Sequence, residues 1–121
     1  MREKPIIEEL PKSLQDFVKR YPDIWRAYER LGEACTKAGP LGAKEVELIK
    51  MVIYGMKQLF TPFKTHVRLA LREGASREEI EHAIVQLLTA EGLSTTVMAM
   101  KWADEVTKDE VKKRKKSQSP R

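Results

Sequence analysis

The sequence has a single cysteine, Cys35, among its 121 residues. One thiol cannot form an internal disulfide, a CxxC redox pair or a cysteine-based zinc site, and we expect no bound metal and no cofactor. No apolar run approaches the ~20 residues that span a bilayer. The charged N-terminus also lacks the apolar core of a signal peptide. We therefore expect a protein of the reducing cytoplasm with no membrane span.

Positive charge is concentrated at one end of the chain. The formal net charge is +5, yet residues 111–121 hold six basic and no acidic side chains, which leaves 17 basic and 18 acidic ones in residues 1–110. We expect a nearly neutral domain over residues 10–110, an arm over 1–9 and a basic flexible tail over 111–121. The run Lys112–Lys116 favours weak contact with anions; the alternative is a solvated, frayed helix end.

Every strong hydrophobic periodicity in the sequence is helical. The chain is therefore predicted to be all-α, with about six helices in antiparallel hairpins. Breaks between the helices are predicted at Pro22, residues 38–42, Gly74 and Gly92. The last helix is expected to fray into the basic tail.

Two helix starts carry capping patterns. Ser76 and Glu79 have the spacing of a capping box, and the helix that follows is expected to continue to about Glu91. Thr61 followed by Pro62 is predicted to open the fourth helix, with the threonine as its cap.

The third helix, expected from about residue 44 to residue 58, is strongly apolar. Five apolar residues cluster on one side of its helical wheel: Leu48, Ile49, Val52, Ile53 and Met56. Met51 and Tyr54 look exposed instead, and spare apolar surface of this kind usually marks an interface between proteins. We therefore expect a homo-oligomer.

Two histidines and one glutamate are candidates for acid–base chemistry. His82 lies opposite the apolar stripe of its helix and is expected to be solvated. His66 lies at the edge of an apolar arc, where an imidazole either packs with one satisfied nitrogen or titrates beside a pocket. Glu47 shares a mixed arc with Lys50, and its spacing alone favours a solvated ion pair.

Two stretches of sequence resemble the carboxymuconolactone decarboxylase / alkylhydroperoxidase-D-like family. Residues 41–50 follow the pattern Leu-x-x-Lys-x-x-Glu-Leu-Ile, and residues 66–80 follow His-x-x-x-Ala-Leu-x-x-Gly-Ala-Ser-x-Glu-Glu-Ile. The likeness covers roughly residues 10–106. It implies an alkylhydroperoxidase-D-like helical bundle that assembles as a trimer or a hexamer.

The resemblance places the family's glutamate at Glu47 and its histidine at His66. The thiol peroxidases of the family carry two cysteines before the histidine, and those positions fall at Leu59 and Pro62. A thiolate is indispensable to that chemistry. The resemblance therefore excludes a CxxC thiol peroxidase.

The decarboxylase branch, whose members look like lyases that remove CO2 from a carboxylated muconolactone, lacks these cysteines and is the nearer enzymatic analogue. By this resemblance, His66 would protonate the carbanion or enolate and Glu47 would set the histidine tautomer. The substrate would be a small carboxylated or lactone molecule, bound by a cation among Lys50, Lys64 and Arg68. The pocket candidates are Lys50, Met51, Tyr54, Leu59, Pro62 and Phe63.

The chain departs from this branch at Thr89 and Ser94, where a tyrosine and a proline are usual. The alternative is therefore a non-catalytic oligomeric scaffold or a small-ligand-binding protein. The enzyme hypothesis predicts that Glu47 and His66 meet in a cleft of mixed apolar and ionisable lining. The alternative predicts Glu47 open to water and His66 packed.

Overall fold

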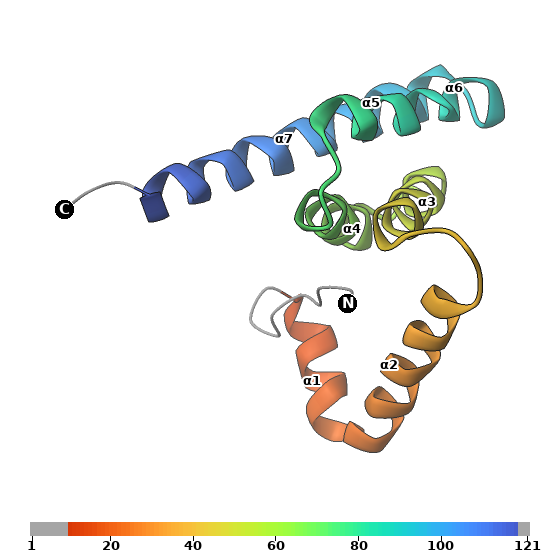
Figure 1. Cartoon of the computed structure of the whole chain (residues 1–121), viewed down its shortest axis with the longest axis vertical. Helices are drawn as coiled ribbons and strands as arrows, with labels where there is room; N and C mark the ends of the chain where they lie inside the picture. Colours follow the sequence, from red (N-terminus) through yellow and green to blue (C-terminus); the bar gives the residue numbers. More distant parts are fainter. Residues whose placement is uncertain (1–9, 119–121) are drawn as a thin grey trace.

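Within residues 10–118, the part of the chain that the computed structural model describes, there are seven helical segments and no strand (Figure 1). They are α1 (Lys12–Arg20), α2 (Pro22–Lys37), α3 (Ala43–Met56), α4 (Phe60–Arg72), α5 (Arg77–Val85), α6 (Leu87–Ala90) and α7 (Leu93–Gln118). The all-α prediction is confirmed. The arm expected over residues 1–9 and the end of the expected tail, residues 119–121, lie outside the described residues.

The α3–α4 hairpin lies at the centre of the fold (Figure 1). Helices α5, α6 and α7 cover one side of it, and the hydrophobic core between them includes Met51, Phe63, Ile84, Leu87 and Val106. The α1–α2 hairpin lies on the other side, and these two helices, which are described over their full length, contain no buried residue. The core therefore holds α3 to α7 together, whereas α1 and α2 bound an open space.

The buried face of α3 differs from the predicted one. It consists of Glu47, Met51 and Gly55, spaced by four residues, and Met51 is fully buried rather than exposed. The ring of Phe63 packs so closely that a Cβ added at Gly55 would lie 3.1 Å from it. Three of the residues expected on the core side are instead 40 to 46% exposed: Ile49, Ile53 and Met56. Because α3 is apolar on most sides, its periodicity could not decide which side faces α4.

The capping box and the glycine breaks are present as predicted. Ser76 Oγ accepts a hydrogen bond from the Glu79 backbone N–H at 3.0 Å, and Glu79 Oε1 accepts one from the Ser76 N–H at 2.9 Å. Gly74 and Gly92 follow their helices with φ of +97° and +127°, a region that favours glycine.

Two helix boundaries were predicted wrongly. Helix α4 begins at Phe60 with Leu59 as its N-cap residue, so Pro62 is the third helical residue and Thr61 does not cap the helix. A proline fits there because the first turn leaves its N–H groups without helical acceptors. The helix after Ser76 was expected to be continuous but is interrupted at Gln86, which separates α5 from α6.

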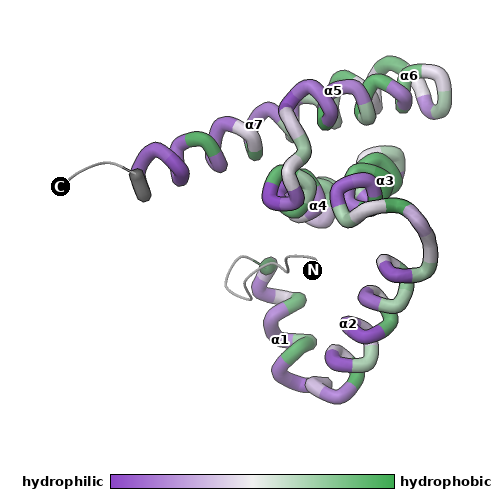
Figure 2. The backbone as a smooth tube through the Cα atoms, in the orientation of Figure 1, coloured by the Kyte–Doolittle hydropathy of each residue, from purple (hydrophilic) through white to green (hydrophobic). Residues whose placement is uncertain are grey.

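Helix α7 is longer than the sequence indicated. It includes Lys112–Lys116, whose side chains are exposed, and Figure 2 shows this end of the helix as mostly hydrophilic. Ion pairs join α4 and α5 to its middle: Lys64–Glu105 at 3.8 Å, Arg72–Glu110 at 3.7 Å and Arg77–Asp104 at 3.5 Å. Among the described helices, none combines the length and the apolar composition needed to cross a bilayer.

Candidate functional site

Glu47 of α3 and His66 of α4 contact each other across the central hairpin. Glu47 Oε2 lies 2.7 Å from His66 Nδ1. The Glu47 side chain is fully buried, whereas 13% of the His66 side chain is exposed. The predicted approach of the two side chains is therefore confirmed, and Glu47 is not the solvated carboxylate that its own helical wheel favoured.

The turn between α3 and α4 brings these residues together. Gln58 has a left-handed backbone with φ of 58°, and the Leu59 N–H donates to the Tyr54 carbonyl at 3.0 Å. The chain thus reverses within a few residues, and the two helices run antiparallel. Glu47 lies about three turns before Gln58 and His66 about two turns after it, since an α-helix has 3.6 residues per turn.

The contact determines which imidazole nitrogen is available to a ligand. A carboxylate in its ionised form only accepts hydrogen bonds, so with Glu47 ionised the hydrogen of this contact belongs to His66 Nδ1. Nε2 is then the nitrogen left for a ligand. In the neutral imidazole Nε2 accepts a proton, and in the imidazolium it donates one, so the pair can serve as a base or as an acid at this position.

Tyr54 contacts the face of the same imidazole. It lies two turns after Glu47 on α3, and its ring stacks on His66 with centroids 5.1 Å apart and planes inclined by 15°. Burial raises the pKa of Tyr54, and the neighbouring Tyr28 raises it further. The phenol is therefore neutral at physiological pH.

His66 and Tyr54 line a cavity of about 950 Å³ between the α1–α2 and α3–α4 hairpins. Its volume falls in the range of about 300–1,000 Å³ that is usual for small-molecule sites. Most of the lining is apolar and includes Leu14, Phe17, Trp25, Ile53 and Leu69. The ionisable lining residues besides the histidine and the tyrosines are Glu29, Glu33, Lys50 and Lys57. This is the mixed lining that the enzyme hypothesis predicts.

The predicted pocket residues are divided between this cavity and other parts of the fold. Lys50, Tyr54 and Pro62 line the cavity. Met51 and Phe63 are fully buried in the core on the other side of the hairpin from α1 and α2.

The remaining predicted residues lie away from the cavity lining. Leu59 is the N-cap residue of α4 and is 45% exposed. Lys64 pairs with Glu105 of α7, and Arg68 is not among the cavity's lining residues. Of the cations expected to bind an anion, only Lys50 lines the cavity.

The wall formed by α2 was missed by the sequence prediction. It places Trp25 and Tyr28 opposite α3 and α4, with ring centroids 5.6 Å apart. In the sequence they belong to an amphipathic stretch that also includes Ile24, Leu31 and Cys35. That pattern does not reveal which helix they face.

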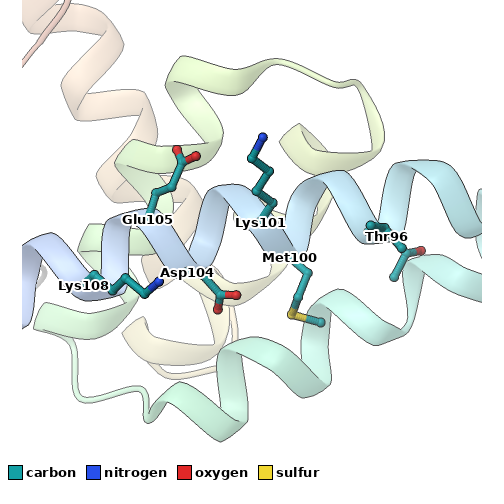
Figure 3. A pocket seen from close by; sticks show the side chains of 7 residues that line it. Thr96, Met100, Lys101, Asp104, Glu105 and Lys108 are labelled. Atoms are coloured by element: carbon teal, nitrogen blue, oxygen red, sulfur yellow. The ribbon is translucent and has the colours of Figure 1, made fainter.

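A shallower hollow of about 570 Å³ lies along α7 (Figure 3). Its charged lining residues are Lys101, Asp104, Glu105 and Lys108, and it has neither a histidine nor a cysteine. It therefore lacks a side chain that ordinarily titrates near neutrality. Across the described residues no group of three or more His, Cys, Asp or Glu side chains could hold a metal ion, and Cys35 is exposed on α2.

Comparisons of the sequence and of the fold with known proteins indicate the same family. The sequence model of the carboxymuconolactone decarboxylase family matches residues 22–105. The fold is similar to that of a carboxymuconolactone decarboxylase family protein from Legionella pneumophila, with a TM-score of 0.71 and 27% identity over 80% of this chain and 86% of that one. It is also similar to a proposed carboxymuconolactone decarboxylase from Burkholderia xenovorans, with a TM-score of 0.69 and 23% identity over 86% and 84% of the two chains. No curated protein sequence matches.

Proposed function

Because the chain belongs to the carboxymuconolactone decarboxylase family, we propose that it is a decarboxylase-like lyase that acts on a small carboxylated or lactone substrate. One observation carries this proposal. A fully buried carboxylate, Glu47, holds Nδ1 of His66 at 2.7 Å, and His66 lies on the wall of a cavity of about 950 Å³. This is the arrangement that a general acid needs, because it fixes both the reactive nitrogen and the hydrogen-bond partner behind it.

In the proposed reaction, Lys50 binds an anionic group that the substrate retains. Lys50 lies one turn before Tyr54 on α3, and it lines the same cavity as His66. The largely apolar lining would lower the local dielectric around the reacting carbon once a substrate fills the cavity. A low-dielectric surrounding of this kind favours departure of neutral CO2 from a carboxylate.

The proton step then belongs to His66. When the bond to the departing carboxylate breaks, its electron pair stays on the carbon and is delocalised into the lactone carbonyl. The imidazolium donates its Nε2 proton to that carbon, and the neutral imidazole keeps the Nδ1 hydrogen that Glu47 accepts. In this proposal Glu47 accepts the Nδ1 hydrogen before and after the transfer, and it sets the tautomer of the neutral ring.

The alternative function is a non-catalytic oligomeric scaffold or a small-ligand-binding protein. The residues at the family's cysteine positions, Leu59 and Pro62, carry no thiol, which fits this alternative as well as the lyase. It would retain the cavity without the proton transfer. Catalysis, rather than binding, therefore separates the two.

Assembly into a homo-oligomer is a second part of the proposal. Helices α1 and α2, which are described over their full length, bury no residue, and the outer apolar side chains of α3 are 40 to 46% exposed. Apolar surface of this extent is usually covered. By family resemblance we propose a trimer or a hexamer, and light scattering after size-exclusion chromatography should give three or six times the chain mass. A monomer at micromolar concentration would contradict this proposal.

The lyase is tested by incubating the protein in D2O with a panel of carboxylated unsaturated γ-lactones. We expect release of CO2 and a single deuterium on the carbon that lost it, detected by proton NMR. His66→Gln should lower the rate by about 10²–10⁴-fold, the usual contribution of a general acid. The matched control is His82→Gln, because His82 is exposed on α5 and should leave the rate unchanged. Ligand binding without turnover would favour the non-catalytic alternative, whereas full activity in His66→Gln would contradict the role of His66 as the general acid.

A further inference from the structure

We propose that Tyr54 is a positioning residue whose ring fixes the plane of the His66 imidazole and thereby the direction of Nε2. The catalytic consequence rests on the proposed function. The positioning itself is a property of the free protein, and it can be measured without any substrate.

A single hydrogen bond does not fix an imidazole. Glu47 Oε2 holds Nδ1 at 2.7 Å, yet the ring can still turn about this contact because the terminal torsion of a histidine side chain has broad minima. Such a turn would sweep Nε2 through an arc. A proton donor that moves in this way spends much of its time pointed away from the reacting carbon.

The ring of Tyr54 limits this turn. Its centroid lies 5.1 Å from that of the imidazole, and the two planes are inclined by 15°, so the rings form an offset stack. Rotation of the imidazole out of its plane would break the stack and bring its edge into the phenol ring. The carboxylate thus fixes one edge of His66, and the phenol fixes one face.

Both constraints come from one rigid element. Glu47 and Tyr54 lie seven residues apart on α3, two turns along the same side of the helix, and Tyr54 packs against the hydrophobic core. The imidazole itself comes from α4, which packs along α3. A shift of α4 relative to α3 would therefore disturb the contacts of His66 with Glu47 and with Tyr54 at the same time.

The ring rather than the hydroxyl of Tyr54 carries this role. Burial and the neighbouring Tyr28 both raise the pKa of the phenol. The tyrosine ring in the stack therefore stays uncharged across physiological pH. The contact with His66 is made by the aromatic face. Phenylalanine, which has the same face, should therefore replace Tyr54, whereas leucine should not.

The test uses the full chain labelled with ¹⁵N-histidine and long-range ¹H–¹⁵N spectra at neutral pH. In the wild type and in Tyr54→Phe, His66 should show one tautomer with Nδ1 protonated. In Tyr54→Leu, signals of the other tautomer should appear, and any lyase activity should fall about three- to tenfold in kcat with a smaller change in KM. His82 provides an internal reference in every spectrum. Tyr21→Leu is the matched control, because Tyr21 packs on Phe17 and does not line the cavity.

Two results would overturn the inference: an unchanged His66 tautomer in Tyr54→Leu, or an equal disturbance in Tyr54→Phe. Tyr54→Met keeps a similar volume without an aromatic face, and it serves for the same comparison where the leucine variant loses helical circular dichroism. The inference and the lyase proposal can fail separately. If the tautomer changed only in the non-aromatic variants while the protein decarboxylated none of the lactones, the inference would be supported and the lyase proposal contradicted.

Discussion

The two members of the Glu47–His66 pair should contribute unequally to stability. Glu47 has no exposed surface, whereas 13% of the His66 side chain is exposed at the cavity wall. His66→Leu removes the imidazole from a fully buried carboxylate, and breaking a buried pair in this way costs about 3–5 kcal/mol. Glu47→Met leaves an imidazole that water can reach, so we expect about 1–2 kcal/mol, within the range for a hydrogen-bonding group that loses its partner.

The double variant, Glu47→Met with His66→Leu, should recover most of this loss. It replaces the polar pair by apolar side chains of similar volume, a change that is often neutral or stabilising. The effects of the two single variants should therefore be strongly non-additive, with a coupling of about 3 kcal/mol. Urea unfolding followed by far-UV circular dichroism measures all four proteins. Protein concentration must be the same throughout, because an oligomer makes stability depend on concentration.

The most discriminating part of this prediction is that His66→Leu loses more unfolding free energy than Glu47→Met. If Glu47→Met destabilised the protein as much as His66→Leu, the difference in burial would not govern the energetics of the pair. If the two changes were simply additive in the double variant, the 2.7 Å contact would contribute nothing to folding.

Three further predictions concern the helices around the site. The ion pair of Lys44 and Glu79, hydrogen-bonded at 2.8 Å, raises the pKa of the lysine and lowers the pKa of the glutamate. Lys44→Met should therefore lose stability in urea unfolding at neutral pH. This loss should shrink below about pH 4.5 and above about pH 10.5, the usual pKa values of the two groups, because one partner then loses its charge. Gly55→Val should lower the unfolding free energy by roughly 1–3 kcal/mol, because even a Cβ would lie 3.1 Å from a core phenylalanine ring. Gly74→Ala, at φ of +97°, should cost about 1–2 kcal/mol in the same assay, whereas Gly39→Ala, where the added Cβ meets no atom within 4 Å, should be near neutral.

The ends of the helices could be predicted where their signals are local. Pro22, Gly74 and the Ser76 capping box each act within a few residues of the chain, and the structure has a helix boundary at each. The start of α4 was misplaced because Thr61 has the chemistry of a helix cap, whereas the chain leaves the hairpin turn two residues earlier and begins the helix at Phe60.

The burial of Glu47 could not be predicted from its own helix. On α3 alone it belongs with Lys50 on a mixed arc, and its partner, His66, lies on another helix. Only the family resemblance related the two positions before the structure did. The α2 wall, with Trp25 and Tyr28, depends on how the chain folds back through residues 38–42, and no periodic pattern encodes that direction.

A crystal structure of the assembled protein with a bound carboxylated γ-lactone would test the central claim most directly. We expect the lactone in the cavity between the α1–α2 and α3–α4 hairpins, with one of its atoms within about 3.2 Å of His66 Nε2. Glu47 should still contact Nδ1 in that complex. Side chains of a second copy filling the cavity, or a lactone bound elsewhere with the two residues apart, would contradict the proposed site.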